Sequence, residues 1–455
     1  MAQSAEQDQE DKAPPRRRPM SRLAVVIYTL CWSVLLCFGL LVAIMQDRML
    51  PVPEPLREKL TQVLNADRTL PIVRFSRAEL GLTELFHPQL VLHGVQFSDG
   101  QTGAGVQFGA LDVVIHGPAL LFGQIAPRSL TLSDAFVDLR RRLDGSFDLG
   151  FVISANSTGV GSLDEILDAT EDFFDREDFR HLTEARLDQL TVNYTDRVTK
   201  RAWTFDGGRL SARRANGLMT LRGDLALLAG GGELATLGLF YKATGAGAGT
   251  LGAEFDNLPA QDLAVQSKAL TWLNFVDGNL SGSFRSTRTA GKVGKLNALL
   301  DFGAGTLSAG PESYPVSYSK AKTYFTYDPK RARLDISLAS IKSDWGALSA
   351  EGYALLQLGG SSQRSSSGMV LHLDVDSAVF DKTPWWSEPL QVTAASAQVK
   401  LNYDPLTLDL GLLQAEVNGT DLSLSGSAAL TPLGWSYNGQ GGLPSVGSQT
   451  VMTLW

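Results

Sequence analysis

The residue types that carry out chemistry are sparse in this sequence, and their spacing offers little to catalysis. The 455 residues include five histidines, none in the H-E-x-x-H spacing of a zinc-binding helix: His87, His93, His116, His181 and His372. His93 and His116 could lie on neighbouring strands and share a metal ion, but ordinary surface or turn positions suit them better. We therefore expect neither a metal site nor a metal cofactor.

A glycine pattern from Gly247 to Gly252 (GAGTLG) has the spacing G-x-G-x-x-G. That pattern binds dinucleotides only where a strand leads into it and a helix begins there. The next residues, AEFDN, do not begin a helix convincingly, so the pattern predicts a glycine-rich turn. The sequence also contains no G-x-S-x-G nucleophile turn and no P-loop. An enzyme is consequently the weakest of three hypotheses, and no cofactor is expected.

Acidic residues crowd one predicted helix between residues 161 and 180. Ser162 and Glu165 form a capping-box pattern at its start. The order D-x-[DN]-x-[DN]-G of a calcium loop is absent, so the sequence predicts a solvated acidic face, with docking of a basic partner as the alternative. The acidic residues are Asp164, Glu165, Asp168, Glu171, Asp172, Asp175, Glu177 and Asp178.

The segment Leu23 to Met45, with Trp32 inside it, contains 23 residues without a charge. As a helix it is about 34 Å long, enough to cross a bilayer, and too long for a cleaved signal peptide. Arginines precede it at positions 16–18 and 22, which places the N-terminus in the cytoplasm and the bulk of the chain across the membrane. Net charge is −8, and without clustered positive charge no nucleic acid partner is expected.

The stretch from Arg128 to Phe151 (RSLTLSDAFVDLRRRLDGSFDLGF) alternates apolar and polar residues, as a half-buried strand does. Asp144-Gly145 signals a hairpin. A two-residue loop places Arg142 opposite Phe147, whereas a three-residue loop pairs apolar with apolar residues. We predict the second register and a bulge near Ser133-Asp134. The predicted pairs are Leu139 with Leu149, Val137 with Phe151, and Arg140 with Asp148.

An internal repeat extends the strand pattern. The sequence LDISL after Tyr327-Asp-Pro and the sequence LDLGL after Tyr403-Asp-Pro are each followed by a segment that ends in glycine, and a looser copy runs from Tyr194 to Gly223. Roughly 20 strands at ~4.8 Å spacing give a sheet on the order of 100 Å long. The predicted fold class is mostly β: a long, twisted antiparallel meander forming a U-shaped groove, with a few short helices. Its apolar face could be hidden by another sheet, by barrel closure or by an apolar molecule.

The predicted organisation has seven segments. They are a disordered cytoplasmic tail (1–22), a transmembrane helix (23–45), a β segment (46–160), an acidic helix (161–180), a second β segment (181–257), a helix (258–277) and a repeated β-meander (278–455) that ends without a closing element, as in a truncated chain.

The sequences PQLVLHGVQF, GALDVVIHGPALLFGQIAPRSLTLSDAFVDLRRRLDGSFDL, LTVNYTDRVTKRAWTF and LPAQDLAVQSKALTWL, after a single N-terminal apolar segment, resemble the AsmA-like superfamily and most closely its YhdP-type branch. The resemblance implies a periplasmic protein tethered to the inner membrane, with an apolar groove that carries phospholipid acyl chains toward the outer membrane. Members of that branch are longer than this chain.

Two functions follow as expectations. The first is phospholipid transport or outer-membrane lipid homeostasis, with phospholipid acyl chains, the inner membrane and other envelope proteins as partners. The second is a non-enzymatic scaffold for outer-membrane protein assembly or envelope integrity, with its sheet faces packed on each other. The predicted groove residues are Leu90, Leu92, Val113, Ile115, Leu130, Leu132, Val137, Leu139, Phe147, Leu149, Phe151, Leu334, Ile336, Leu338, Leu408, Leu410 and Leu412.

Overall fold

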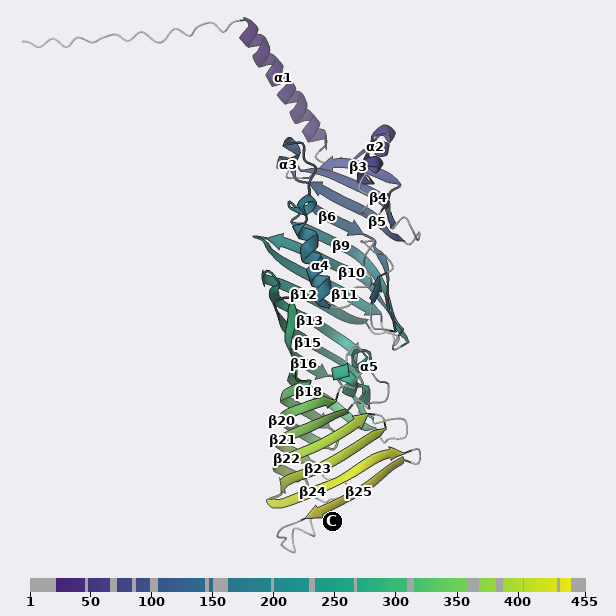
Figure 1. Cartoon of the computed structure of the whole chain (residues 1–455), viewed down its shortest axis with the longest axis vertical. Helices are drawn as coiled ribbons and strands as arrows, with labels where there is room; N and C mark the ends of the chain where they lie inside the picture. The colour runs from purple at the N-terminus through teal and green to yellow at the C-terminus, as the bar shows by residue number, and fades with distance from the viewer. Residues whose placement is uncertain are drawn as a thin grey trace, which may run out of the picture.

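A computed structural model gives the structure of the chain, with its strands stacked along one long axis (Figure 1). It describes residues 22–45, 48–65, 72–83, 87–98, 105–143, 147–149, 163–197, 200–228, 234–265, 268–308, 315–357, 368–381, 388–403, 405–431 and 434–442. Residues 1–21 of the predicted tail (1–22), Phe151 and the Asp144-Gly145 turn lie outside these ranges, and Arg22 begins the first helix.

The helices of the described residues are short except for the first. They are α1 (Arg22–Met45), α2 (Glu54–Leu64), α3 (Gly117–Leu121), α4 (Leu163–Asp175) and α5 (Ala260–Ala264), with the 3-10 helices η1 (Glu177–Phe179) and η2 (Lys268–Phe275). None of the helices in the described residues combines the length and the apolar character needed to span a bilayer.

The strands of the described residues form a single sheet of 25 members. The N-terminal strands are β1 (Leu50–Pro51), β2 (Ile72–Arg74), β3 (Arg77–Leu82), β4 (Pro88–Ser98), β5 (Gly105–Ile115), β6 (Pro127–Ser133), β7 (Phe136–Arg141), β8 (Phe147–Leu149), β9 (Glu184–Asp196), β10 (Arg201–Ala215), β11 (Leu218–Leu228), β12 (Leu234–Gly245) and β13 (Ala248–Pro259). The C-terminal strands are β14 (Val276–Asp277), β15 (Asn279–Thr289), β16 (Lys292–Phe302), β17 (Gly305–Leu307), β18 (Val316–Asp328), β19 (Arg333–Ser343), β20 (Gly346–Gln357), β21 (Gly368–Phe380), β22 (Leu390–Tyr403), β23 (Leu406–Val417), β24 (Thr420–Thr431) and β25 (Gly434–Gly442).

The sheet is mixed, which corrects the purely antiparallel prediction. Strands β6 and β7 pair with β9 in parallel, because the chain runs back along β8 after β7 and then passes through α4 before β9 begins. A parallel neighbour requires such a crossover, and a helix is its usual form. From β9 onward most strands pair antiparallel with their neighbours in sequence, as a meander does.

The register of the predicted hairpin is confirmed where the structure describes it. Leu139 pairs with Leu149 and Arg140 with Asp148 across β7 and β8. Asp134 has a φ of 54°, so the predicted irregularity lies between β6 and β7. Because of it, Leu132 and Val137 both pair with inward positions of β9.

Bulges recur at equivalent places in the two close repeats. The pairing of β19 with β20 shifts between Ile336 and Ala339, and that of β23 with β24 shifts between Leu410 and Leu413. Each bulge turns the last leucine of its repeat motif to the opposite face of the sheet. The placement of Leu338 and Leu412 in the groove is therefore wrong: Leu338 lies opposite Tyr324 on the outer face, and Leu412 is 45% exposed.

The glycine that ends each repeat lies opposite a large apolar residue on the neighbouring strand. Gly223 pairs with Leu210, Gly352 with Ile336 and Gly426 with Leu410. A Cβ built on Gly352 would lie 2.0 Å from the carbonyl oxygen of His372, and the φ of Gly352 is +151°. Gly352 and Gly426 require glycine because backbone atoms of the next strand occupy the space of a Cβ, whereas at Gly223 the nearest atom is the end of the Leu210 side chain.

Replacing Gly352 with alanine tests this close packing. We expect Gly352→Ala to lower the free energy of unfolding by about 1–3 kcal/mol, since the added methyl group overpacks the ladder. The matched control is Gly411→Ala on β23, where an added Cβ meets nothing nearer than 3.7 Å. The shift in the midpoint of urea unfolding measures both variants, and equal shifts would show that the repeat glycine has no special role.

Candidate functional site

Cross-strand pairs define one continuous apolar face, which we call the inner face. Directly paired residues of an antiparallel ladder lie on the same side of the sheet. The ladder runs from Leu92–Leu111 through Leu221–Tyr241 to Leu373–Ala397 without changing side. The inner face therefore carries apolar side chains along the whole length of the described sheet.

Helices cover the inner face over its first part. Strands β2 to β11 hold a buried cluster that includes Leu92 and Val95, and Leu60 and Leu64 of α2 pack against it. The helix α4 contributes Leu167 and Phe174 to a second cluster. The helices α5 and η2 contribute a third, in which Leu273 is fully buried. Helices therefore fill a large part of this face, which is none of the three arrangements that the sequence suggested: another sheet, barrel closure or an apolar molecule.

The predicted groove residues divide between filled and open sections. Leu90 and Leu92 are 9% and 1% exposed and belong to the protein core. Val113, Leu132 and Val137 are partly buried against that core, Leu130 against the second cluster and Leu139 against a small cluster around Trp203. Ile115 pairs with Pro127 at the end of β5, and Phe147 pairs with Arg141. Further along, Leu334 is buried in the third cluster, Ile336 packs against it, and Leu408 and Leu410 lie on the inner side of β23.

An open cavity of about 270 Å³ lies on the inner face of β16 to β21, beside η2. Its lining is almost entirely apolar and includes Trp272, Phe302, Tyr318, Phe325, Ile341, Leu348, Met369, Leu371 and Leu373. The volume is close to the lower end of small-ligand sites, about 300 Å³. We call this cavity and its continuation along the inner face the apolar trough.

The trough continues toward the C-terminal strands without a helix above it in the described residues. Val399 and Leu401 of β22 pair with Leu410 and Leu408 of β23, which pair in turn with Gly426 and Ala428 of β24. These side chains are only half-buried. They form an apolar surface that no described segment of the chain covers.

The sheet curls enough for η2 to reach the far wall of the trough. The ring of Phe275 in η2 lies 5.9 Å from the ring of Tyr403 in β22, centroid to centroid. Burial raises the pKa of Tyr403 to about 12. The hydroxyl stays protonated at neutral pH, so the trough presents no charge at this position.

The outer face differs in character. An open depression there of about 830 Å³ is lined by Asp224, Glu254, Asp256 and Asp301, among others. Glu254 pairs with Arg285 at 3.2 Å and Asp301 with Lys322 at 3.6 Å. The sheet thus has an apolar inner face and an ionic, solvated outer face.

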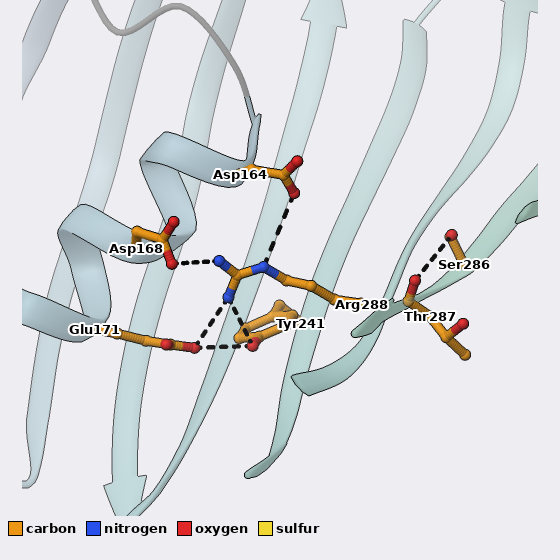
Figure 2. A network of polar contacts seen from close by, with 7 residues as sticks. All are labelled: Asp164, Asp168, Glu171, Tyr241, Ser286, Thr287 and Arg288. Atoms are coloured by element: carbon orange, nitrogen blue, oxygen red, sulfur yellow. Dashed lines mark hydrogen bonds and ion pairs between the residues drawn. The ribbon is translucent and has the colours of Figure 1, made fainter. Parts of the chain in front are cut away.

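A buried arginine holds α4 over the inner face (Figure 2). Arg288 of β15 is 1% exposed, and its guanidinium contacts the carboxylate of Asp168 and lies 3.3 Å from that of Glu171. Tyr241 donates a hydrogen bond of 2.9 Å to Glu171 and accepts one of 3.4 Å from Arg288. Desolvation alone lowers the pKa of Arg288, but these bonds outweigh it and raise the pKa.

The acidic helix is therefore only partly a solvated face. Asp164, Asp168 and Glu171 face Arg288, and Asp175 accepts a hydrogen bond of 2.5 Å from Arg214. The basic partner of α4 is thus the chain's own sheet. The remaining exposed acidic residues include Asp172, Glu177 and Asp178.

The other chemical patterns do not assemble into a site. His93 contacts Glu79, whereas the His116 ring stacks on His181 at 4.4 Å, so the two histidines of the suggested metal pair lie apart. The described residues contain no group of three potential metal ligands. Of the glycine pattern, Gly247 lies in the turn between β12 and β13 with a φ of 60°, whereas Gly249 and Gly252 lie within strand β13, so the predicted turn is confirmed only at its first residue.

Sequence reasoning missed the residues that line the cavity most closely. Tyr318 and Phe325 lie seven residues apart in β18, in opposite phase, and reach the same face only through the register shift after Tyr318. The pairing that brings them and Phe302 beside Trp272 of η2 joins segments far apart in sequence. Arg288 lies 120 residues from Asp168 and carries no local signal.

Comparison with protein-family models, with curated proteins and with solved structures finds no match to this chain. The fold and the trough define a mostly-β protein built on one long mixed sheet with a continuous apolar face.

Removing the Arg288 side chain tests the attachment of α4. Arg288→Ala removes the buried cation from the carboxylates of Asp168 and Glu171, whose side chains are 55% and 22% exposed. Because water reaches these carboxylates, we expect a loss of about 1–3 kcal/mol, less than for a fully buried pair. We expect faster amide hydrogen exchange throughout α4. Arg285→Ala, on the same strand but exposed, is the control, and we expect a change below about 1 kcal/mol for it. Unchanged exchange in α4 after Arg288→Ala contradicts the assignment.

The buried hydroxyl of Tyr403 makes the free energy of unfolding depend on pH. Because its pKa is higher in the folded chain than the ordinary value of 10, the folded state binds more protons between pH 10 and pH 12. Its contribution to stability is complete below pH 10 and is lost as the pH rises toward 12. The free energy of unfolding should fall more steeply over this range in the native chain than in Tyr403→Phe. If the free energy of unfolding falls equally with pH in the two proteins, the side chain of Tyr403 is hydrated and not buried.

Proposed function

We propose that the apolar trough binds phospholipid acyl chains and that the protein serves lipid transport or lipid homeostasis in a cell envelope. The observation that carries the proposal is the open apolar cavity beside η2 and its continuation over β22 to β24. Each CH₂ group removed from water there contributes about 0.8 kcal/mol. Binding requires no catalytic residue.

The chemistry of the trough suits a sliding ligand better than a fixed one. Leucine, valine and alanine repeat along the inner face of β21 to β24, so an acyl chain meets similar surroundings at successive positions. Because the lining is nearly uniform, the free energy of a bound acyl chain changes little as it moves along the trough. The direction of movement then depends on where lipid is supplied and removed.

The proposal includes a membrane anchor formed by α1. The helix exposes large apolar side chains on several sides, among them Ile27, Leu30, Trp32, Val34, Leu36 and Leu40. Exposed apolar side chains of this density suit a lipid environment. The arginines before the helix support a cytoplasmic N-terminus, and the resemblance to the AsmA-like superfamily supports a periplasmic location in an inner-membrane-anchored protein.

A non-enzymatic scaffold for outer-membrane assembly is the second candidate. The observation in its favour is that α2, α4, α5 and η2 fill the inner face over the first part of the sheet, where Val95 and Leu300 are fully buried. A lipid could not pass through such a section without displacing protein. The scaffold needs no open passage.

A pair of leucines on β23 separates the two candidates. Leu410 lies on the inner face, and Leu412 lies on the outer face because of the bulge between them. A photo-crosslinking amino acid placed at residue 410 of the full chain should capture phospholipid, and the same group at residue 412 should not. Mass spectrometry of the crosslinked chain measures the capture.

The matched charge variants complete the test. With the photo-crosslinking amino acid at residue 401, which lies on the inner face opposite Leu408, Leu410→Glu should reduce lipid capture by tenfold or more, since burial of a carboxylate in an apolar site costs several kcal/mol. Leu412→Glu should leave capture from residue 401 unchanged. Equal capture from both positions, or none from either, would falsify the trough proposal and favour the scaffold.

A further inference from the structure

The turn that begins with α3 exposes apolar side chains on a rigid backbone. Phe122 is 85% exposed, Ile125 is 73% exposed and Leu120 is 39% exposed. The turn is held by backbone hydrogen bonds of 2.9–3.0 Å, from Phe122 and Gln124 to Ala119 and from Gly123 to Leu120. The exposed side chains therefore project from a fixed turn, which we call the α3 tip (residues 117–126).

Basic and aromatic side chains surround the base of the tip. Arg180 donates hydrogen bonds to Gln124 (2.6 Å) and to His181 (3.1 Å), and Arg128 contacts His87. In the part of the chain that the structure describes, neither Arg128 nor Arg180 forms an ion pair with a carboxylate, although the exposed Glu177 and Asp178 lie close to Arg180 in sequence.

The α3 tip lies at the end of the sheet where the chain leaves α1. A Cβ built on Gly81 of β3 would lie 2.6 Å from Sδ of Met49, four residues after α1. Gly81 pairs with Gln89, and His87 lies beside the first residue of α3, 3.3 Å from a Cβ built on Gly117. Figure 1 shows α3 at the same end of the long axis as the last turn of α1.

We propose that the α3 tip docks on the surface of the bilayer in which the proposed function anchors α1, with Phe122 and Ile125 inserted among the lipids and Arg128 and Arg180 near anionic headgroups. Aromatic and aliphatic side chains flanked by cations are the features that hold interfacial segments on anionic membranes. The inference rests on the anchor of the proposed function. It adds a second point of attachment, which fixes the orientation of the sheet relative to the membrane.

A bilayer suits the tip better than a protein groove does. The apolar side chains project from a short convex turn at the end of the molecule, where a flat lipid surface meets them without shape matching. The anchor also keeps that surface permanently within reach. A protein partner is the alternative outcome of the test.

The test uses the full chain with a polarity-sensitive dye on a single cysteine. Cys31 and Cys37 are replaced by serine, and Phe122→Cys carries the dye; Trp345→Cys, also an exposed apolar position but between β19 and β20, is the control. The protein is reconstituted into vesicles of phosphatidylcholine with phosphatidylglycerol. We expect a blue shift and quenching by nitroxide-labelled acyl chains at residue 122 and neither at residue 345.

A second variant tests whether the positive charge of Arg180 contributes to docking. Arg180→Glu should reduce the quenching at residue 122 in vesicles with phosphatidylglycerol and change it little in pure phosphatidylcholine. A water-like, unquenched dye at residue 122 overturns the inference, as does equal quenching at residue 345. Crosslinking from residue 122 to another protein without quenching overturns it in favour of a protein partner.

Failure of this inference is distinguishable from failure of the proposed function. Lipid capture at residue 410 without quenching at residue 122 rejects the docked tip alone. Quenching at residue 122 without capture at residue 410 rejects the lipid-binding trough alone. Loss of the chain from vesicles on alkaline extraction, with no quenching, rejects both the anchor and the tip.

Discussion

The structure depends on keeping one phase of side-chain alternation through a ladder of 25 described strands. A slip of one residue at any pairing would bring charged side chains to the inner face from that strand onward. The chain corrects its phase with single residues at positive φ, such as Asp134, Gln189 and Asn257, with φ values near 55°. Each gives the strand an extra residue where the sequence would otherwise fall out of step. The continuous inner face is the result of these local corrections.

Local patterns are sufficient to predict the hairpin and the bulge before it, because both depend on residues close in sequence. Leu139, for example, pairs with Leu149 across a short loop. The same reasoning could not place Leu338 or Leu412. The motifs LDISL and LDLGL alternate perfectly, and the bulges inside them are set by the pairing with β20 and β24. Alternation in one strand does not report the register of its partner.

The parallel pairing of β6 and β7 with β9 and the attachment of α4 escaped prediction for a related reason. The acidic residues of α4 were visible in the sequence, but the cation that compensates them is on a strand 120 residues away. Composition therefore suggested a solvated helix where the fold has a docked one. The same limit applies to the cavity, whose lining comes from β14, β16 to β21 and η2. The scarcity of helices was predicted correctly, yet α2, α4, α5 and η2 pack on the inner face.

The docked helix also imposes an order on folding. Most strands from β9 onward pair with the strand just made, so the meander can grow by adding local contacts, which form quickly. The contact between α4 and Arg288 is different, since it must wait until β15 has joined the sheet. Until then α4 has only part of its final surroundings and its carboxylates lack their cation. The contact between α4 and Arg288 can therefore form only after the sheet has grown as far as β15. The helix then packs on strands that are already paired.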